Sequence, residues 1–144
     1  MQRYFAIDKC DNSFILADSD LHHICHVMRM KSGDFIEVVF ERVLYKCKVD
    51  IGSNVSVLID SIIDSHDESH SIVLIVPVLK EQKMDLILQK ATELGVSRII
   101  PVVFERCIVK VNDKESRKLD RWNRIVKEAS EQCKRISVPI IDNV

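Results

Sequence analysis

The chain has 144 residues, of which 47% are hydrophobic and 30% charged, and its net charge is −1. This length suits one ordinary domain or two small ones, and the composition argues against wholesale disorder. No apolar run approaches the length of a membrane span, and the N-terminus lacks the apolar stretch of a secretory signal. Five scattered cysteines without a CxxC pair suit reduced thiols. We therefore expect a soluble, cytoplasmic protein with no membrane partner.

The charge is divided unevenly between the two halves of the chain. Residues 1–71 hold 7 basic and 12 acidic side chains, whereas residues 72–144 hold 14 basic and 10 acidic ones. Such a contrast indicates two modules, and a basic second module suits an acidic partner such as RNA. The alternative is a solvated helix face rich in lysine and arginine, which is common in globular proteins.

The three glycines, Gly33, Gly52 and Gly95, are far apart in the sequence. Phosphate-binding loops of the GxGxxG and GxxxxGK[ST] types need several closely spaced glycines, so neither pattern can be written here. The GxSxG pattern is absent as well. These residues therefore do not contain the usual loop for a nucleotide-like cofactor.

In chain order, the first half is predicted to form short strands and one helix. Apolar or alternating stretches predict strands at 3–7, 35–40, 43–49 and 55–60. The second and third of these strands flank Glu41 and Arg42, which indicates an antiparallel hairpin. Several short strands with one helix favour a small β-barrel, and the polar stretch 64–71 is the candidate linker.

The helix of the first half is expected over 21–30, with Asp18, Ser19 or Asp20 as its N-cap. Helical spacing gives it an inward stripe made of Leu21, Ile24, Cys25 and Met28. The opposite face carries His22, His26 and Arg29.

The second half alternates strands and helices. The continuous apolar run 72–79 is typical of a strand buried on both faces of a parallel sheet. A helix follows, with Gly95 as its left-handed C-cap and Leu86 off its apolar stripe, where Leu86 could serve a subunit contact. The inward stripe of this helix is Met84, Ile87, Leu88, Ala91 and Leu94.

A second buried strand is expected over 96–104, a long helix over about 114–135, and the start of a third strand over 137–141. The long helix packs inward with Leu119, Trp122, Val126, Ala129 and Cys133. This β-α-β-α-β pattern predicts the beginning of an open α/β sheet.

Two groups of residues could carry metal or covalent chemistry. His22 and His26 are spaced to chelate a metal ion from one helix face, and His66 and His70 repeat that spacing. Nothing pairs the two clusters, so we expect solvated histidines and no metal site. Cys107 and Cys133 are candidate nucleophiles, although Cys133 falls on a core stripe, where cysteine packs as a small hydrophobe.

The long helix has an arginine-rich face opposite its core stripe. Guanidinium groups suit phosphate oxygens, which makes Arg117, Arg121 and Arg124 candidate RNA-binding residues, with Arg135 on the same far side. The alternative is a solvated face on which Glu128 and Glu131 balance the arginines.

Ordered motifs over residues 80–141 resemble those of the RsmE family, the small-subunit ribosomal RNA uridine N3 methyltransferases. The series runs K-x-x-K-M-D, Q-K-A-T-E-L-G-V, E-R-C, R-W, E-Q-C-x-R and V-P. The first half is similar too, with R-Y-F near its start and H-H-x-x-x-V-M-R-M-x-x-G-D at 22–34. The resemblance covers nearly the whole chain.

The resemblance implies an α+β and then an α/β architecture. A PUA-like RNA-binding β-barrel would occupy 1–70, and the N-terminal part of a SPOUT-type methyltransferase domain would occupy 71–144. Enzymes of this family work as homodimers and transfer a methyl group from S-adenosylmethionine to a uridine N3 of 16S ribosomal RNA. Carried over by motif, Arg3, His23 and Arg29 would face the RNA. The residues near the catalytic cleft would be Arg106, Gln132 and Arg135.

The chain also departs from the family pattern. In the family, the knot and the cofactor site come from a later G-P-E-G-G segment and an L-G-x-x-I-L-R-x-E-T stretch, and neither occurs here. At the tip of the 35–49 hairpin, ERVLYKCKV replaces a glycine-containing sequence. We expect an incomplete domain without its C-terminal knot, so that these residues alone neither bind S-adenosylmethionine nor methylate RNA. The alternative is a non-catalytic RNA-binding module.

Overall fold

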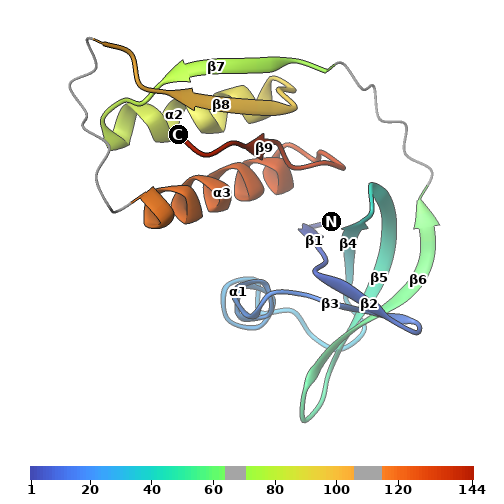
Figure 1. Cartoon of the computed structure of the whole chain (residues 1–144). Helices are drawn as coiled ribbons and strands as arrows, with labels where there is room; N and C mark the ends of the chain where they lie inside the picture. Colours follow the sequence, from blue (N-terminus) through green and yellow to red (C-terminus); the bar gives the residue numbers. More distant parts are fainter. Residues whose placement is uncertain (64–70, 106–114) are drawn as a thin grey trace. The chain divides into compact units, whose positions relative to one another are not determined.

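The computed structural model describes residues 1–63, 71–105 and 115–144, so most of the predicted linker at 64–71 lies outside the described residues. The chain divides into two units, Met1–Asp67 and Glu68–Val144 (Figure 1). Each unit has its own hydrophobic core.

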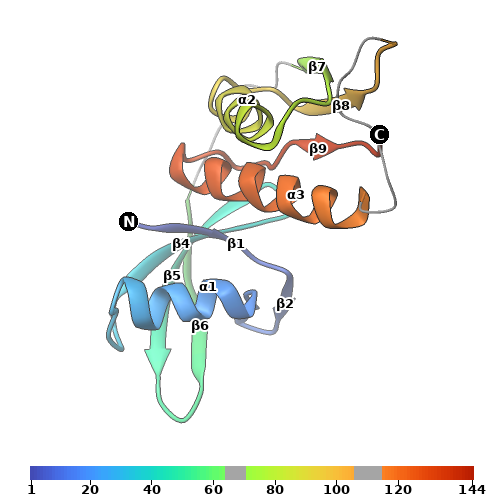
Figure 2. The ribbon, with the colours of Figure 1, turned by 90° about the vertical axis from the view of Figure 1, so that its left-hand side faces the viewer.

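The N-terminal unit is built on a six-stranded sheet, the counterpart of the predicted barrel (Figures 1 and 2). In sheet order the strands are β1, β4, β5, β6, β3 and β2, and among the described strands of this unit only β1 and β4 pair in parallel. The strands span Arg3–Phe5 (β1), Asp8–Cys10 (β2), Ser13–Ile15 (β3), Phe35–Phe40 (β4), Val43–Ile51 (β5) and Val55–Ile63 (β6). All four predicted strands are confirmed. The short β2 and β3 carry no apolar alternation that would reveal them in the sequence.

Strands β4 and β5 form the predicted hairpin. Phe40 pairs with Val43, which leaves Glu41 and Arg42 as a two-residue turn. Both turn residues have positive φ, 49° and 65°, a conformation that favours asparagine and glycine. The long pairing of the two strands therefore holds two non-glycine residues in the left-handed region.

The helix of this unit begins earlier than predicted and changes geometry halfway. α1, Asp18–His22, continues into a π-helical turn, η1, His23–Val27. The N-cap is Ala17, which makes no side-chain capping bond, so the predicted caps are wrong. A π-helix bonds residue i to i+5, and ordinary helical spacing therefore fails along η1. Met28, predicted to be buried, is consequently 44% exposed, whereas Ile24 is fully buried.

Inward side chains of the strands pack with Ile24 to form the core of the unit. Its buried members are Tyr4, Phe14, Leu16, Ile24, Ile36, Val38, Tyr45, Cys47, Val49 and Val57. Burial, and then the charge of Asp60, raise the pKa of the Cys47 thiol to about 12. Cys10, by contrast, is exposed on β2.

We predict that Cys47 resists thiol reagents in the folded protein. At about pH 8 only a very small fraction of Cys47 is thiolate, so Cys10 should react at least about a hundredfold faster. Mass spectrometry after a timed exposure to iodoacetamide measures both rates, and unfolding in urea should equalise them. Equal rates in the folded protein would contradict the burial of Cys47.

The C-terminal unit alternates strands and helices, as predicted. The order is β7 Val73–Pro77, α2 Glu81–Glu93, β8 Arg98–Val102, α3 Glu115–Gln132 and β9 Ile140–Ile141. The strands lie side by side in chain order, β7-β8-β9, and both pairs are parallel. The predicted β-α-β-α-β pattern is therefore confirmed, with strands shorter than the apolar runs that indicated them.

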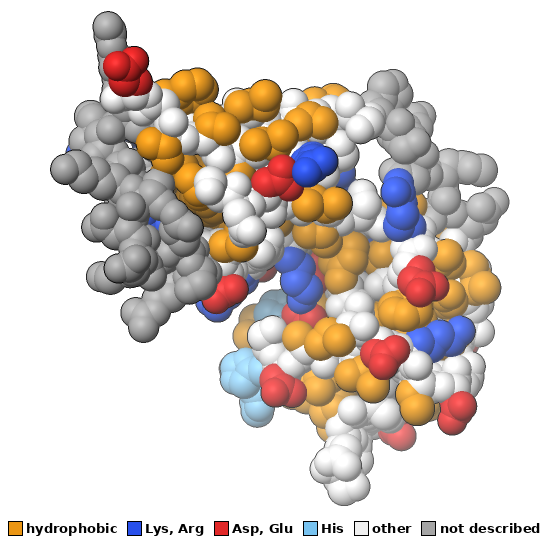
Figure 3. All heavy atoms as spheres, in the orientation of Figure 1, with side chains coloured by type: hydrophobic (Ala, Val, Ile, Leu, Met, Phe, Trp, Pro, Cys, Tyr) orange, Lys and Arg blue, Asp and Glu red, His pale blue; other side chains and the backbone are white. Residues whose placement is uncertain are grey.

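This sheet is covered on one face, which contradicts the prediction that β7 is buried on both. Along β7, Val76 is 5% exposed and Ile75 is 61% exposed; along β9, Ile141 is 9% exposed and Ile140 is 65% exposed. The cause is topological, because both helices pack against the same face. Hydrophobic side chains gather over β7 and β8 in the space-filling view (Figure 3).

The covered face holds the predicted stripes of both helices. Met84, Leu88 and Ala91 of α2 pack in one core with Trp122 and Val126 of α3. Leu94, predicted to be on the stripe, is instead 80% exposed, because α2 ends at Glu93. Gly95 then has a φ of 95°, as expected of a left-handed C-cap. Neither α2 nor α3 nor the short α1, the α-helices of the described ranges, is long and apolar enough to cross a membrane.

We predict that equal substitutions on the two faces differ sharply in cost. Ile99→Thr places a hydroxyl in the core and should lower the free energy of unfolding by about 3 kcal/mol or more. Ile75→Thr keeps β-branching at a position that is already exposed and should cost less than about 1 kcal/mol. Urea denaturation measures both values. Similar losses would mean that the open face is covered in solution.

Candidate nucleic-acid interface

Arg3 lies in the N-terminal unit and is largely buried. Its Nε and one terminal nitrogen each lie 2.8 Å from the same carboxylate oxygen of Glu37, the residue paired with it across β1 and β4. Only 8% of the Arg3 side chain is exposed. In this structure the guanidinium holds the parallel pair of strands together, and its predicted contact with RNA stays a prediction.

His23 lies where α1 passes into the π-helical turn. Its Nδ1 is hydrogen-bonded to the hydroxyl of the buried Tyr4, at 2.9 Å. This bond fixes the imidazole against β1. The rings of His22 and His26 are exposed on the same segment, with their centroids 4.5 Å apart. Within the described ranges, no three His, Cys, Asp or Glu side chains are grouped to hold a metal ion.

Arg29 follows the π-helical turn and is exposed. Its backbone adopts the left-handed conformation, with a φ of 51°. The next residue, Met30, donates a backbone hydrogen bond to the carbonyl of Ile24. The side chain is exposed and has no hydrogen-bond or ion-pair partner among residues 1–63. Local strain of this kind often accompanies functional sites. Of the three predicted residues of this unit, Arg3 is bonded to Glu37 and His23 to Tyr4, whereas the Arg29 side chain is exposed.

The arginines of α3 have different surroundings. Arg121 makes ion pairs with Glu81, at 3.0 Å, and with Asp85, both on α2. The hydrogen bonds that Arg121 donates to Glu81 and then to Asp85 raise its pKa. Arg124 is exposed and unpaired within the described part of the chain. The side chain of Arg117, like the whole of Arg106, lies outside the described residues.

Arg135 lies beyond the end of α3 and turns back into the unit. Its guanidinium donates hydrogen bonds to the carbonyl oxygens of Thr92, at 2.9 Å, and Val96, at 2.8 Å. The prediction that it lies on the outer face is wrong, because α3 ends at Gln132 and a left-handed Lys134 redirects the chain. Arg135 therefore joins the end of α3 to the turn between α2 and β8.

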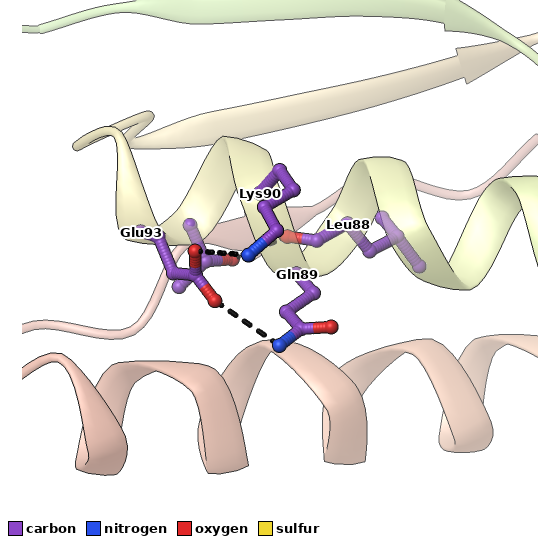
Figure 4. Close-up of polar contacts among 5 residues, drawn as sticks. Leu88, Gln89, Lys90 and Glu93 are labelled. Atoms are coloured by element: carbon purple, nitrogen blue, oxygen red, sulfur yellow. Dashed lines mark hydrogen bonds and ion pairs between the residues drawn. The ribbon is translucent and has the colours of Figure 1, made fainter.

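Residues of the Q-K-A-T-E-L-G-V motif also make hydrogen bonds next to this turn. Gln89 and Lys90 donate hydrogen bonds to the two carboxylate oxygens of Glu93, at 3.1 and 2.8 Å (Figure 4). The bond from Lys90 lowers the pKa of Glu93. The buried Thr92 hydroxyl donates to the carbonyl of Leu88, at 2.7 Å. The motif is thus explained largely by the ending of α2.

Gln132 is the last residue of α3, and its side chain is exposed. It lines a shallow groove of about 450 Å³ between α2 and α3, together with other polar side chains that include Gln82 and Gln89. Gln132 and Arg135 therefore face different surroundings within the C-terminal unit.

A larger groove, of about 560 Å³, opens where α2 begins. Four cationic side chains line it, namely Lys80, Lys83, Lys118 and Arg121. We call it the lysine groove. The first two lysines belong to the K-x-x-K-M-D motif, and their i, i+3 spacing at a helix start was the available signal in the sequence.

Comparison with known proteins identifies both units. A family model described as an RNA methyltransferase domain matches residues 66–144, more than half of the chain. A second model, described as an RNA methyltransferase PUA domain, matches residues 16–54. The chain belongs to the RNA methyltransferase family.

The relatives and solved structures confirm the resemblance to RsmE. The chain is 35% identical to the ribosomal RNA small subunit methyltransferase E of Bacillus subtilis and 30% identical to that of Mesomycoplasma hyopneumoniae. These matches cover 100% and 99% of this chain but 60% and 62% of the relatives. The Neisseria gonorrhoeae enzyme, solved with S-adenosyl methionine, superposes with a TM-score of 0.87 at 28% identity, over 99% of this chain and 62% of that one. The chain thus spans about 60% of the length of the relatives it matches.

We predict that Arg135 stabilises the fold. Arg135→Ala removes the donor to the Val96 carbonyl and leaves the Thr92 carbonyl with the Gly95 amide, so it should lower the free energy of unfolding by about 1–3 kcal/mol. Arg124→Ala, at an exposed and unpaired position, should change it by less than about 0.5 kcal/mol. Urea denaturation of both variants checks this. An Arg135→Ala variant as stable as the wild type would contradict the anchoring role.

Proposed function

We propose that the chain is the RNA-facing, N-terminal part of an enzyme that methylates a uridine N3 of 16S ribosomal RNA in the small subunit. The match of nearly the whole chain to small-subunit ribosomal RNA methyltransferases supports this most strongly. The homodimer implied by the resemblance belongs to the same proposal.

The proposed reaction sets requirements on the chain's own residues. Uridine N3 carries a proton that must leave before or during attack on the methyl carbon, so positive charge must stabilise the developing uracil anion. S-adenosylmethionine supplies the methyl group when it is bound. Arg106 stays a candidate for this charge. The Arg135 guanidinium already binds two carbonyls, so we assign it to positioning the turn between α2 and β8.

The lysine groove does not fit S-adenosylmethionine. The cofactor carries a sulfonium cation, whereas the lysine groove is lined by four cations and two carboxylates. The open apolar face of the sheet is consistent with a domain that further polypeptide completes. We therefore assign the cofactor site, and the SPOUT knot, to segments outside these 144 residues.

The first experiment is titration of the 144-residue chain with S-adenosylmethionine in a calorimeter. The proposal predicts no binding heat. Adding a polypeptide that contains the remaining part of the Bacillus subtilis relative should restore binding. A stoichiometric micromolar signal from the chain alone would contradict the assignment.

A second function is a non-catalytic RNA-binding module, which the exposed Arg29 and Arg124, unpaired within the described residues, would equally serve. Both functions predict that the chain binds ribosomal RNA with an affinity that falls steeply as salt rises. Filter binding between about 50 and 200 mM salt measures the slope. Restoration of cofactor binding by the added polypeptide separates the enzyme from the module. A flat salt dependence would contradict both functions.

A further inference from the structure

The lysine groove combines unpaired positive charge with an apolar wall. Lys80 and Lys83 are exposed and Lys118 is half-buried. Their ammonium groups have no hydrogen-bond or ion-pair partner within the described residues. Leu79 and the largely buried Trp122 supply apolar surface beside them.

Arg121 holds both acidic side chains of the groove. Glu81 and Asp85 both face Arg121, which makes an ion pair with each of them. The four cations that line the groove outnumber its two carboxylates, so the described residues of the groove carry net positive charge. An anion that enters it meets lysines, while the two carboxylates are held by the arginine.

The position of the groove in the fold also favours the binding of an anion. It lies at the carboxyl end of β7, where the chain passes through Val78 and Leu79 into α2. Ligands of open α/β sheets bind beyond the carboxyl ends of the strands, typically where the strand order reverses. Lys80, the N-cap of α2, makes no side-chain capping bond, so the first amide groups of the helix keep their partial positive charge.

We propose that the lysine groove binds one nucleotide unit of a single-stranded RNA, with its phosphodiester on Lys80, Lys83 and Lys118 and its ribose or base against Leu79. This rests on the proposed function, since RNA is the substrate of that function. A volume of about 560 Å³ is within the range of nucleotide-sized sites. Lysines act there as point charges that follow a backbone, so the groove binds RNA without reading its sequence.

The test compares two variants with the same loss of charge. Lys80→Gln with Lys83→Gln removes two groove cations. Lys90→Gln with Lys127→Gln removes one cation of α2 and one of α3, which pair with Glu93 and Glu131 outside the groove. The probe is a fluorescently labelled oligouridylate of about ten nucleotides, measured by anisotropy across a range of salt.

The groove variant should bind the oligonucleotide roughly tenfold to thirtyfold more weakly at about 100 mM salt. Its slope of log affinity against log salt should fall by about 1.4, the value for two lost phosphate contacts on a single strand. The control variant should keep the wild-type slope. Circular dichroism and urea denaturation verify that both variants are folded.

The outcomes separate this proposal from the proposed function. Wild-type binding that the groove variant leaves unchanged overturns the groove and keeps the RNA-binding function. Equal weakening by both variants also overturns the groove, because the effect is then one of net charge. Tight binding of uridine monophosphate in the groove, without any contribution of the groove to oligonucleotide binding, overturns the assignment to an RNA chain. Wild-type protein that does not bind RNA contradicts the proposed function itself.

Discussion

The handedness of β-α-β connections determines the arrangement of the C-terminal unit. Parallel strands joined by a helix cross over in the right-handed sense almost always. Because β7, β8 and β9 lie in chain order, both crossovers go the same way, and both helices lie on one face. One face of the sheet is therefore packed and the other remains apolar and exposed. The same topology brings the end of β7 and the start of α2 to one edge, where the lysine groove lies.

Arginine and lysine have different roles in the C-terminal unit. Arg121 joins α2 to α3, Arg135 binds the carbonyls at the end of α2, and Arg98 pairs with Asp142 of the C-terminal segment at 3.0 Å. These planar guanidinium groups make several directed bonds each, which suits them to holding elements together. The groove lysines make none within the described residues. The positive charge available to an RNA therefore comes mainly from lysines, with Arg124 as the exposed exception.

The sequence pattern predicted the order of elements better than the surroundings of single side chains. Strands β4 to β6, the alternation of the second half and the cap at Gly95 follow from local periodicity and backbone preference, and each is confirmed. The π-helical turn was not predictable, because the spacing of Ile24 and Met28 fits an α-helix equally well. Arg135 was misplaced because helical spacing was extended past Gln132, where the helix ends.

The exposed face of β7 shows a second limit. An apolar run indicates that a strand can be buried on both faces, but what covers the second face depends on the rest of the fold. Similarly, the lysines of the groove belong to a motif that could be recognised, while the convergence of Lys118 with them depends on the packing of α3 against α2. The sequence therefore indicated which lysines to consider, but only the structure shows that Lys118 lies near Lys80 and Lys83.

The central claim is that the lysines of the groove bind the RNA, whereas the paired lysines of the same unit do not. Reductive methylation with ¹³C-formaldehyde keeps the charge of each lysine and gives it a separate NMR signal. During titration with oligouridylate, the account predicts that the signals of Lys80, Lys83 and Lys118 shift together and saturate, while that of the paired Lys90 stays in place. Shifts spread equally over all lysines, or confined to those of the N-terminal unit, would contradict it.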